Sequence, residues 1–127
     1  MNNTDPFISE LERQKQTEVA LRYNNGKLRW SLIDWKSLES MVKVLEKGAQ
    51  KYDDHNWKKG MPTSQISESL LRHMFAFMNG EDNDPETNES HLGHVMCNAM
   101  FLIYNLRENP KFDDRYRNKN TEENKQI

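Results

Sequence analysis

The sequence predicts an all-α, compact domain of three main helices that is completed by oligomerisation. In three stretches, 38–52, 64–79 and 90–107, apolar residues recur at the roughly 3.6-residue period of a helix. The third stretch becomes apolar on almost every side, and such a helix is buried on several sides. With 35% hydrophobic residues the chain offers little else to cover it. We therefore expect a symmetric homo-oligomer, a dimer or larger, with Phe101 and Tyr104 near the interface.

Length, charge and cysteine content exclude several classes of protein. The 127 residues suit one domain, and the net charge of -2 gives no indication of direct nucleic-acid binding. No apolar run approaches the roughly 18 residues of a membrane span, and the N-terminus lacks the basic and apolar regions of a signal peptide. The single cysteine, Cys97, fits a reducing compartment. We expect a cytoplasmic protein without membrane contact.

The two ends of the chain are predicted to lie outside the helical domain of residues 23–108. Residues 1–22 are strongly polar, so a helix there would be marginal or would depend on a partner. Residues 109–127 are charged and have few apolar side chains. We expect this tail to be mostly disordered from Lys111 onward.

A cationic pair follows a predicted turn at residues 23–26. Residues 27–33 partly alternate in polarity, which predicts an extended segment with Lys27 and Arg29 on one side. The pair is either two solvated surface cations or a phosphate clamp, in which Gly26 would let the backbone come close.

The first main helix carries Gly48 and Ala49 on its apolar side, which predicts the close approach of another backbone. An irregular connection with Asn56 and Trp57 follows. These two residues either offer an amide and a ring to a nucleobase, or the tryptophan packs as a plug on the core. In the second main helix, His73 lies at the edge of the apolar face. It is either a buried histidine bonded to a backbone carbonyl or part of a site.

The second helix is predicted to end with Gly80 in the C′ position, just before an acidic connection. This connection contains no Lys or Arg and five carboxylates: Glu81, Asp82, Asp84, Glu86 and Glu89. Such a density of charge costs stability through self-repulsion unless something compensates it. A divalent cation is the simplest compensation, and the alternative is a solvated acidic loop.

The third helix has two contrasting faces. Its apolar stripe, predicted to face the core, consists of Leu92, Val95, Met96, Ala99, Ile103 and Leu106. On nearly the opposite side, His91, His94 and Asn98 follow the spacing i, i+3, i+7 and share one line. Imidazoles suit transition metals, which strengthens the metal hypothesis. Because these three residues lie away from the stripe, we expect them to be replaceable without unfolding the protein.

An ordered set of short motifs between Tyr23 and Leu106 resembles a phage-borne family. The motifs are Gly26-Lys27-x-Arg29, Gly48-Ala49-x-Lys51-Tyr52, Asn56-Trp57-x-x-Gly60, Arg72-His73, Gly80-Glu81, Asp84-Pro85-Glu86-Thr87, His91-x-x-His94 and Asn98. The set is similar to the N-terminal domain of dATP/dGTP diphosphohydrolases, which also occurs as a short stand-alone phage protein. The resemblance implies a fold similar to the all-α MazG-type group and a place in the host cytoplasm.

Two departures from the implied pattern bear on the site. Asn88 stands where the family has glycine, and asparagine can still adopt a positive φ. The MazG-type pattern pairs carboxylates on helix faces, whereas Glu39 and Glu46 fall on a side predicted to be exposed. A metal would therefore draw on the acidic connection and the histidines. The HD-type phosphohydrolases need an adjacent His-Asp pair, which this sequence lacks.

The resemblance implies hydrolysis of purine (deoxy)nucleoside triphosphates to monophosphate and pyrophosphate in phage nucleotide metabolism, with Mg²⁺ or Mn²⁺ as cofactor. The expected metal ligands are Glu81, Asp84 and Glu86. His91 and His94 are the expected further ligands or proton carriers, and His73 is expected as a third catalytic histidine. The expected substrate-binding residues are Lys27, Arg29, Lys51 and Arg72 for the phosphates, Asn56 and Trp57 for the base, and Asn98. The alternatives are a non-catalytic module that sequesters a nucleotide or nucleotide-derived signal, and a helical interaction protein without a ligand.

Overall fold

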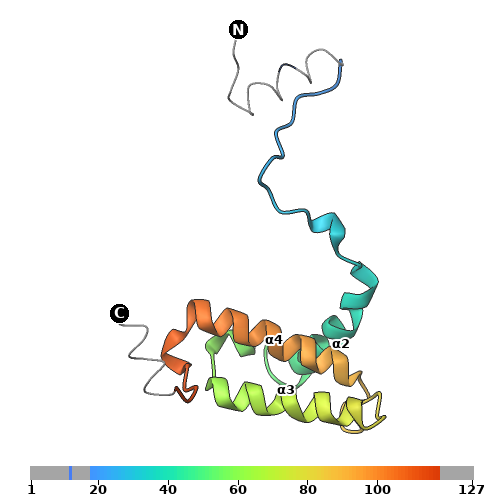
Figure 1. The fold of residues 1–127 in the computed structure, drawn as a ribbon. Helices are drawn as coiled ribbons and strands as arrows, with labels where there is room; N and C mark the ends of the chain where they lie inside the picture. The colour runs from blue at the N-terminus through green and yellow to red at the C-terminus, as the bar shows by residue number, and fades with distance from the viewer. Residues whose placement is uncertain (1–11, 13–17, 118–127) are drawn as a thin grey trace. The chain divides into compact units, whose positions relative to one another are not determined.

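The computed structural model describes residue 12 and residues 18–117, and within them the predicted all-α fold is confirmed (Figure 1). The α-helices are α2 (Trp35–Lys51), α3 (Thr63–Met78) and α4 (His91–Glu108). The short 3-10 helices are η1 (Trp30–Leu32), η2 (Asn56–Lys59) and η3 (Pro110–Phe112). The described residues contain no strand, and none of their helices is long and apolar enough to cross a membrane.

The chain divides into two units, residues 1–33 and residues 34–127, and the three α-helices belong to the second. In the first unit the predicted turn is confirmed, because the Lys27 amide donates to the Asn24 carbonyl at 3.1 Å and Gly26 has φ +79°. The expected extended segment is wrong at η1, where backbone amides bond within the segment itself. No neighbouring strand is described here, so local bonds satisfy these amides. The polar segment 1–22 lies mostly outside the described residues.

Asp34 occupies the N-cap of α2, which begins at Trp35 rather than at Leu38 as predicted. The Ser37 amide donates to the Asp34 carbonyl at 3.2 Å, and the Ser37 hydroxyl donates to the Asp34 carboxylate. Aspartate is a favoured N-cap residue. The apolar periodicity starts only at Leu38, so it does not register this first turn.

Both ends of the acidic connection are fixed by helix caps. Gly80 has φ +97°, its amide donates to the Phe77 carbonyl at 2.9 Å, and the Glu81 amide donates to the Ala76 carbonyl at 3.0 Å. This pair of bonds is a Schellman motif, so the predicted C′ role of Gly80 is confirmed. At the other end, the Ser90 hydroxyl accepts the first free amides of α4, at 3.1 and 3.3 Å.

Helix α4 is central, because it packs against both α3 and α2. At its contact with α2, a Cβ added to Gly93 would lie only 2.5 Å from the Ser40 carbonyl oxygen. The close approach predicted at Gly48 is wrong, since nothing lies within 4 Å of a Cβ added there. Cys97 is buried beside the same contact, its thiol donates to the Met41 carbonyl at 3.3 Å, and burial raises its pKa to about 12. This thiol is therefore an inert packing group.

The predicted orientation of α4 is wrong. Its buried residues are His91, Gly93, Cys97, Asn98 and Asn105. By contrast, Leu92, Ile103 and Leu106 of the expected core stripe are 39%, 64% and 42% exposed. The polar line faces inward because its groups find partners there, such as the Asn98 amide, which donates to the Ser69 hydroxyl at 3.3 Å. The expectation that His91, His94 and Asn98 can be replaced without unfolding the protein rested on this orientation, and that premise is wrong for the buried His91 and Asn98.

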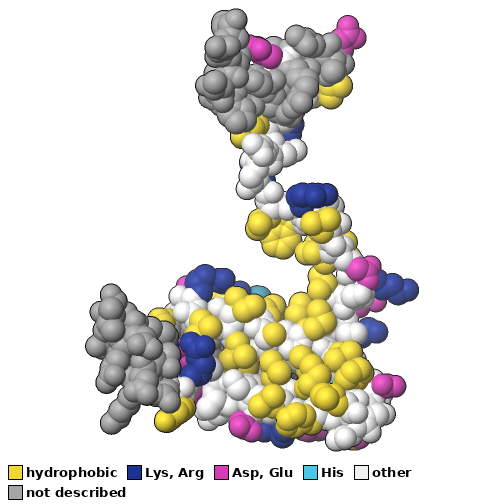
Figure 2. All heavy atoms as spheres, viewed as in Figure 1, with side chains coloured by type: hydrophobic (Ala, Val, Ile, Leu, Met, Phe, Trp, Pro, Cys, Tyr) yellow, Lys and Arg dark blue, Asp and Glu magenta, His cyan; other side chains and the backbone are white. Residues whose placement is uncertain are grey.

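Hydrophobic side chains consequently gather on an outer face of α3 and α4 (Figure 2). The exposed apolar side chains of these two helices include Leu71, Phe75, Phe77, Met78, Leu92, Ile103 and Leu106. Among the described residues, the buried hydrophobic side chains are only Ile66 and Cys97. The single chain thus has a small apolar core and a large apolar surface.

The start of the C-terminal tail differs from the expected disorder. Residues 110–112 form η3, and the Phe112 ring lies 2.7 Å from a Cβ added to Gly60. The Asp114 carboxylate accepts from the Ser64 amide at 2.8 Å and the Ser64 hydroxyl at 2.6 Å, which satisfies donors in the first turn of α3. Residues 118–127 lie outside the described residues.

The α2–α4 contact predicts that Gly93→Ala destabilises the protein. The added methyl group would meet the Ser40 carbonyl, and overpacking of this kind costs about 1–3 kcal/mol. The matched control is Gly48→Ala, which adds the same group in a helix with open space around it and should stabilise by up to about 1 kcal/mol. Urea denaturation of both variants measures the difference, and equal effects would contradict the close approach.

Candidate functional site

The candidate site lies where α3, the acidic connection and the first turns of α4 meet. His73 comes from α3, Asp84 from the connection and His94 from α4. One possible metal-binding atom of each lies within 4.8 Å of the other two. All three residues are half-buried. The caps at Gly80 and Ser90 fix the two ends of the connection, so hydrogen bonds at the helix ends help to position Asp84 beside the two histidines.

The loop that carries Asp84 holds its carboxylate in place. Its Oδ1 accepts from the Glu86 amide at 3.2 Å and its Oδ2 accepts from the Thr87 hydroxyl at 3.2 Å. The Asn88 amide donates to the Asp84 carbonyl at 2.7 Å, and Asn88 has φ +58°. The expected positive φ of this asparagine is therefore confirmed. The same Oδ2 lies 3.5 Å from His94 Nε2.

His91 lies behind His73 and links it to a carboxylate. Its Nε2 is 2.6 Å from Glu81 Oε1 and its Nδ1 is 2.9 Å from His73 Nδ1. The residue is 3% exposed. Because both ring nitrogens already have partners, His91 has no free atom to offer a metal or a substrate.

His94 lies against the other side of His73. The two rings are parallel within 3°, with their centroids 4.1 Å apart. His94 Nε2 is 2.8 Å from the hydroxyl of Thr87. Thr87 is not among the predicted site residues, and its only signal in the sequence is its place in the Asp-Pro-Glu-Thr motif.

The histidines of the cluster favour their neutral form. Burial lowers the pKa of His73, and the charge of His94 lowers it further against the opposing effect of Asp84. Burial also lowers the pKa of His94, again against the opposing charge of Asp84. Burial alone would raise the pKa of Asp84, but hydrogen bonds from Glu86 and Thr87 and the charges of both histidines hold it below its ordinary value. Two neutral imidazoles beside an ionised carboxylate are a donor set that metals bind.

Other predicted residues lie around the cluster in different ways. Glu86 is exposed, and its charge acts on the pKa of His94. Arg72 is exposed, and its charge acts on the pKa of His73. The Asn98 amide donates to the Ser69 hydroxyl at 3.3 Å, which joins α4 to α3. These contacts leave Asn98 as a structural link between the helices.

Three predicted phosphate-binding residues are not part of this cluster. Lys27 and Arg29 belong to the unit of residues 1–33. Lys51 is the last residue of α2, and its ammonium group lies 5.3 Å from the centroid of the Tyr52 ring. All three are exposed.

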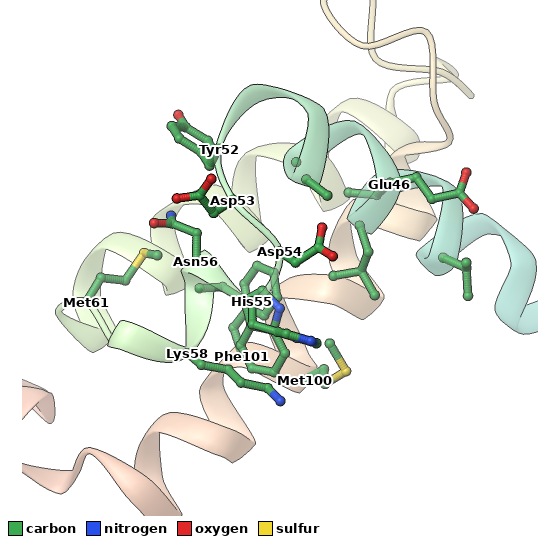
Figure 3. Close-up of a pocket in the computed structure, with 16 residues that line it drawn as sticks. Glu46, Tyr52, Asp53, Asp54, His55, Asn56, Lys58, Met61, Met100 and Phe101 are labelled. Atoms are coloured by element: carbon green, nitrogen blue, oxygen red, sulfur yellow. The ribbon is translucent and has the colours of Figure 1, made fainter.

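A mostly apolar hollow of about 550 Å³ lies between α2, the following connection and α4 (Figure 3). Asn56 and Trp57 line it, together with Phe101. The Trp57 ring also stacks on Phe101 with centroids 4.8 Å apart and meets Tyr104 edge-on at 4.9 Å. Trp57 is thus packed on the domain and lines the hollow at once. Phe101 and Tyr104, which were expected near a subunit interface, contact Trp57 of their own chain.

The fold and the cluster define a small all-α domain with a histidine and carboxylate site between two helices. The chain belongs to the family described as dATP/dGTP diphosphohydrolase, N-terminal, whose model matches residues 17–115. It is 33% identical over 97 residues to a protein of Salmonella phage PMBT28 named dATP/dGTP diphosphohydrolase. That match covers 76% of this chain and 33% of the phage protein, so the chain spans about a third of this curated relative. No solved structure matches the chain.

The lowered histidine pKa values predict that stability rises with pH. Unfolded histidines titrate near 6.5, whereas folded His73 and His94 bind protons less readily. Below about pH 6.5 the unfolded state therefore binds more protons, and the free energy of unfolding should fall as the pH decreases. The contribution of Asp84 is lost only at lower pH, because its ordinary pKa is 3.8.

Thermal melts in a chelating buffer between about pH 5 and pH 7.5 measure this slope. The variant His94→Gln should show a shallower slope than the unaltered protein. A stability that stays constant or rises toward pH 5 would contradict the assignment of buried, neutral histidines.

Proposed function

We propose that this domain hydrolyses purine (deoxy)nucleoside triphosphates between the α and β phosphates, releasing a monophosphate and pyrophosphate. The observation that carries the proposal is the cluster of His73, Asp84 and His94 in a member of a family described by diphosphohydrolase activity. The name of the Salmonella phage relative supports the choice of purine deoxynucleotides.

The cluster suits a divalent ion, with His73, Asp84 and His94 as the residues that would hold it. Of the two ions expected from the sequence, Mn²⁺ suits the two imidazoles better than Mg²⁺. The bound ion would supply Lewis-acid polarisation of the phosphoryl oxygens and a lower pKa for the attacking water. The carboxylates of Glu89 and Glu86 lie close enough to His94 to act on its charge. Either one can accept the proton that the attacking water loses.

The substrate's other groups have candidate partners among the predicted residues. Arg72 lies close enough to act on the charge of His73, so its guanidinium can bind a phosphate at the cluster. The hollow lined by Asn56 and Trp57 suits a purine, which needs apolar contact on its faces and an amide at its edge. Lys51, which belongs to the same unit as the cluster, stays a candidate for the remaining phosphate charge.

A panel of nucleoside and deoxynucleoside triphosphates with Mg²⁺ or Mn²⁺ tests the proposal. Pyrophosphate should appear with the purine deoxynucleotides. Asp84→Asn should lower the rate by about 100-fold, because it removes a charged oxygen at the cluster. The matched control is Asp82→Asn, an exposed carboxylate on the same loop that lies outside the cluster.

Three other results of this panel would contradict the proposal. Orthophosphate as product would indicate a different hydrolase. Binding without any product would indicate a module that sequesters nucleotides. Equal losses in Asp84→Asn and Asp82→Asn would show that the loop's charge, rather than the cluster, governs activity.

We also propose that the outer apolar face of α3 and α4 is covered by a second copy of the chain. The small apolar core of the single chain supports this, because small helical domains often complete their cores by association. The same face on both copies would meet across a two-fold axis.

Sedimentation at micromolar concentration should find a dimer or larger oligomer. Ile103→Lys places a charge on the proposed interface, where the side chain is 64% exposed in the single chain, and should favour the monomer. Tyr116→Lys is the control, because that side chain is 93% exposed and lies outside the face. A monomeric unaltered protein would contradict the proposal.

A further inference from the structure

We propose that His73, Asp84 and His94 form a transition-metal site, and that Glu81 and His91 are positioning residues that keep His73 in the tautomer able to bind the metal. The inference rests on the same site as the proposed function and names the class of ion it takes. Metal binding is measured without nucleotide, so a failure of hydrolysis and a failure of this inference give different results.

The donor set decides the class of ion. One nitrogen from each of two imidazoles and one carboxylate oxygen lie within 4.8 Å of one another. Because His94 Nε2 contacts the Thr87 hydroxyl at 2.8 Å, a metal would either replace that contact or bind Nδ1. Imidazole suits ions such as Zn²⁺ and Co²⁺, whereas Mg²⁺ prefers six oxygen ligands in a near-ideal octahedron. Affinity for nitrogen and oxygen sites also rises from Mn²⁺ through Co²⁺ toward the end of the first transition series. We therefore expect Zn²⁺ and Co²⁺ to bind more tightly than Mn²⁺, and all three more tightly than Mg²⁺.

The cluster can close around one ion with small movements. Metal bonds of about 2.1 Å join ligand atoms that lie at most about 4.2 Å apart, while the three atoms here lie within 4.8 Å of one another. The parallel rings of His73 and His94 must also tilt, because the lone pair of an imidazole lies in the plane of its ring. The last side-chain torsion of histidine has a broad energy well, so the torsion itself permits this tilt.

The tautomer of His73 follows from the hydrogen bonds behind it. A carboxylate only accepts, so the 2.6 Å contact with Glu81 places a proton on His91 Nε2. In the form of His91 that carries this single proton, Nδ1 is an acceptor, and the 2.9 Å contact then makes His73 Nδ1 the donor. The lone pair of His73 is then on Nε2, where it is free to bind a metal. Such carboxylate–histidine arrangements orient metal ligands.

This role differs from the one first predicted for Glu81. Its carboxylate was expected to bind the metal directly, but it contacts His91 and is not one of the three clustered groups. Its side chain is 50% exposed, so replacing it leaves the helix contacts intact. Glu81 is therefore the residue whose substitution best separates positioning from folding.

Isothermal titration calorimetry with each metal alone tests the site. The unaltered protein should bind one Zn²⁺ or Co²⁺ per chain, and Co²⁺ should give the visible absorption of a bound ion. Asp84→Ala should abolish both signals while Asp82→Ala leaves them unchanged. No binding of Zn²⁺ or Co²⁺, or equal binding of Mg²⁺, would overturn the assignment of the site.

Two substitutions of Glu81 test the positioning role. Glu81→Ala removes the acceptor for His91 and should weaken Co²⁺ binding by about 10–100-fold. Glu81→Gln keeps an accepting oxygen without the charge and should restore affinity to within a few-fold of the unaltered protein. Equal losses in both variants would show that the charge itself binds the metal. An unchanged affinity in Glu81→Ala would show that the tautomer is set elsewhere, and either result overturns the positioning role.

Discussion

The packing of α4 on α3 depends on hydrogen bonds between buried polar side chains. His91 meets His73 at 2.9 Å, and Asn98 donates to Ser69 at 3.3 Å. Buried polar groups cost free energy unless each finds a partner, and low surrounding polarity strengthens the bonds that do form. Such an interface tolerates few alternative registers, because a shift of one residue would leave several groups unpaired. The helices are thus held in one arrangement, and the side chains of the cluster are held with them.

Because α3 and α4 are held in one arrangement, the ends of the acidic connection are fixed although the connection itself has few apolar residues. The Schellman motif at Gly80 ends α3, and the Ser90 cap begins α4, so the loop leaves and enters at fixed points. Within it, Asp84 gathers the Glu86 amide and the Thr87 hydroxyl around its carboxylate. Its charge is offset by these dipoles and by the neighbouring histidines, which is why its pKa stays low despite partial burial.

Local rules predicted the elements well and their orientation poorly. Apolar periodicity located all three helices, and the conformations of Gly80 and Asn88 followed from the backbone freedom of those residue types. Periodicity also assigned the apolar stripe of α4 to the core, and this was wrong. Which face is buried depends on the partners that α3 and α2 present, and residues such as Ser40 and Ser69 lie far from α4 in the sequence.

The candidate site was foreseen as a region but not as an arrangement. The density of charged residues drew attention to Glu81, Asp84 and Glu86 alike, whereas only Asp84 of these three lies in the cluster with His73 and His94. Charge density cannot distinguish a carboxylate that faces a metal from one that faces another side chain. Thr87 was missed for a related reason, because a hydroxyl adds no charge and gains its meaning only from its contact with His94.

Stability and function are coupled in this domain because the same side chains serve both. The parallel stack of His73 on His94 helps to join α3 to α4, and the proposed metal binding would require the two rings to tilt. Removing either ring therefore removes a packing contact and a donor atom together. Loss of activity in such a variant does not by itself identify a ligand. Substitutions at the exposed edge of the network, at Glu81, change the proton arrangement while the packed rings stay in place. Substitution of Glu81 can therefore change the protonation pattern of the site through the contacts from Glu81 to His91 and from His91 to His73. The half-exposed Glu81 side chain itself contributes little to the stability of the fold.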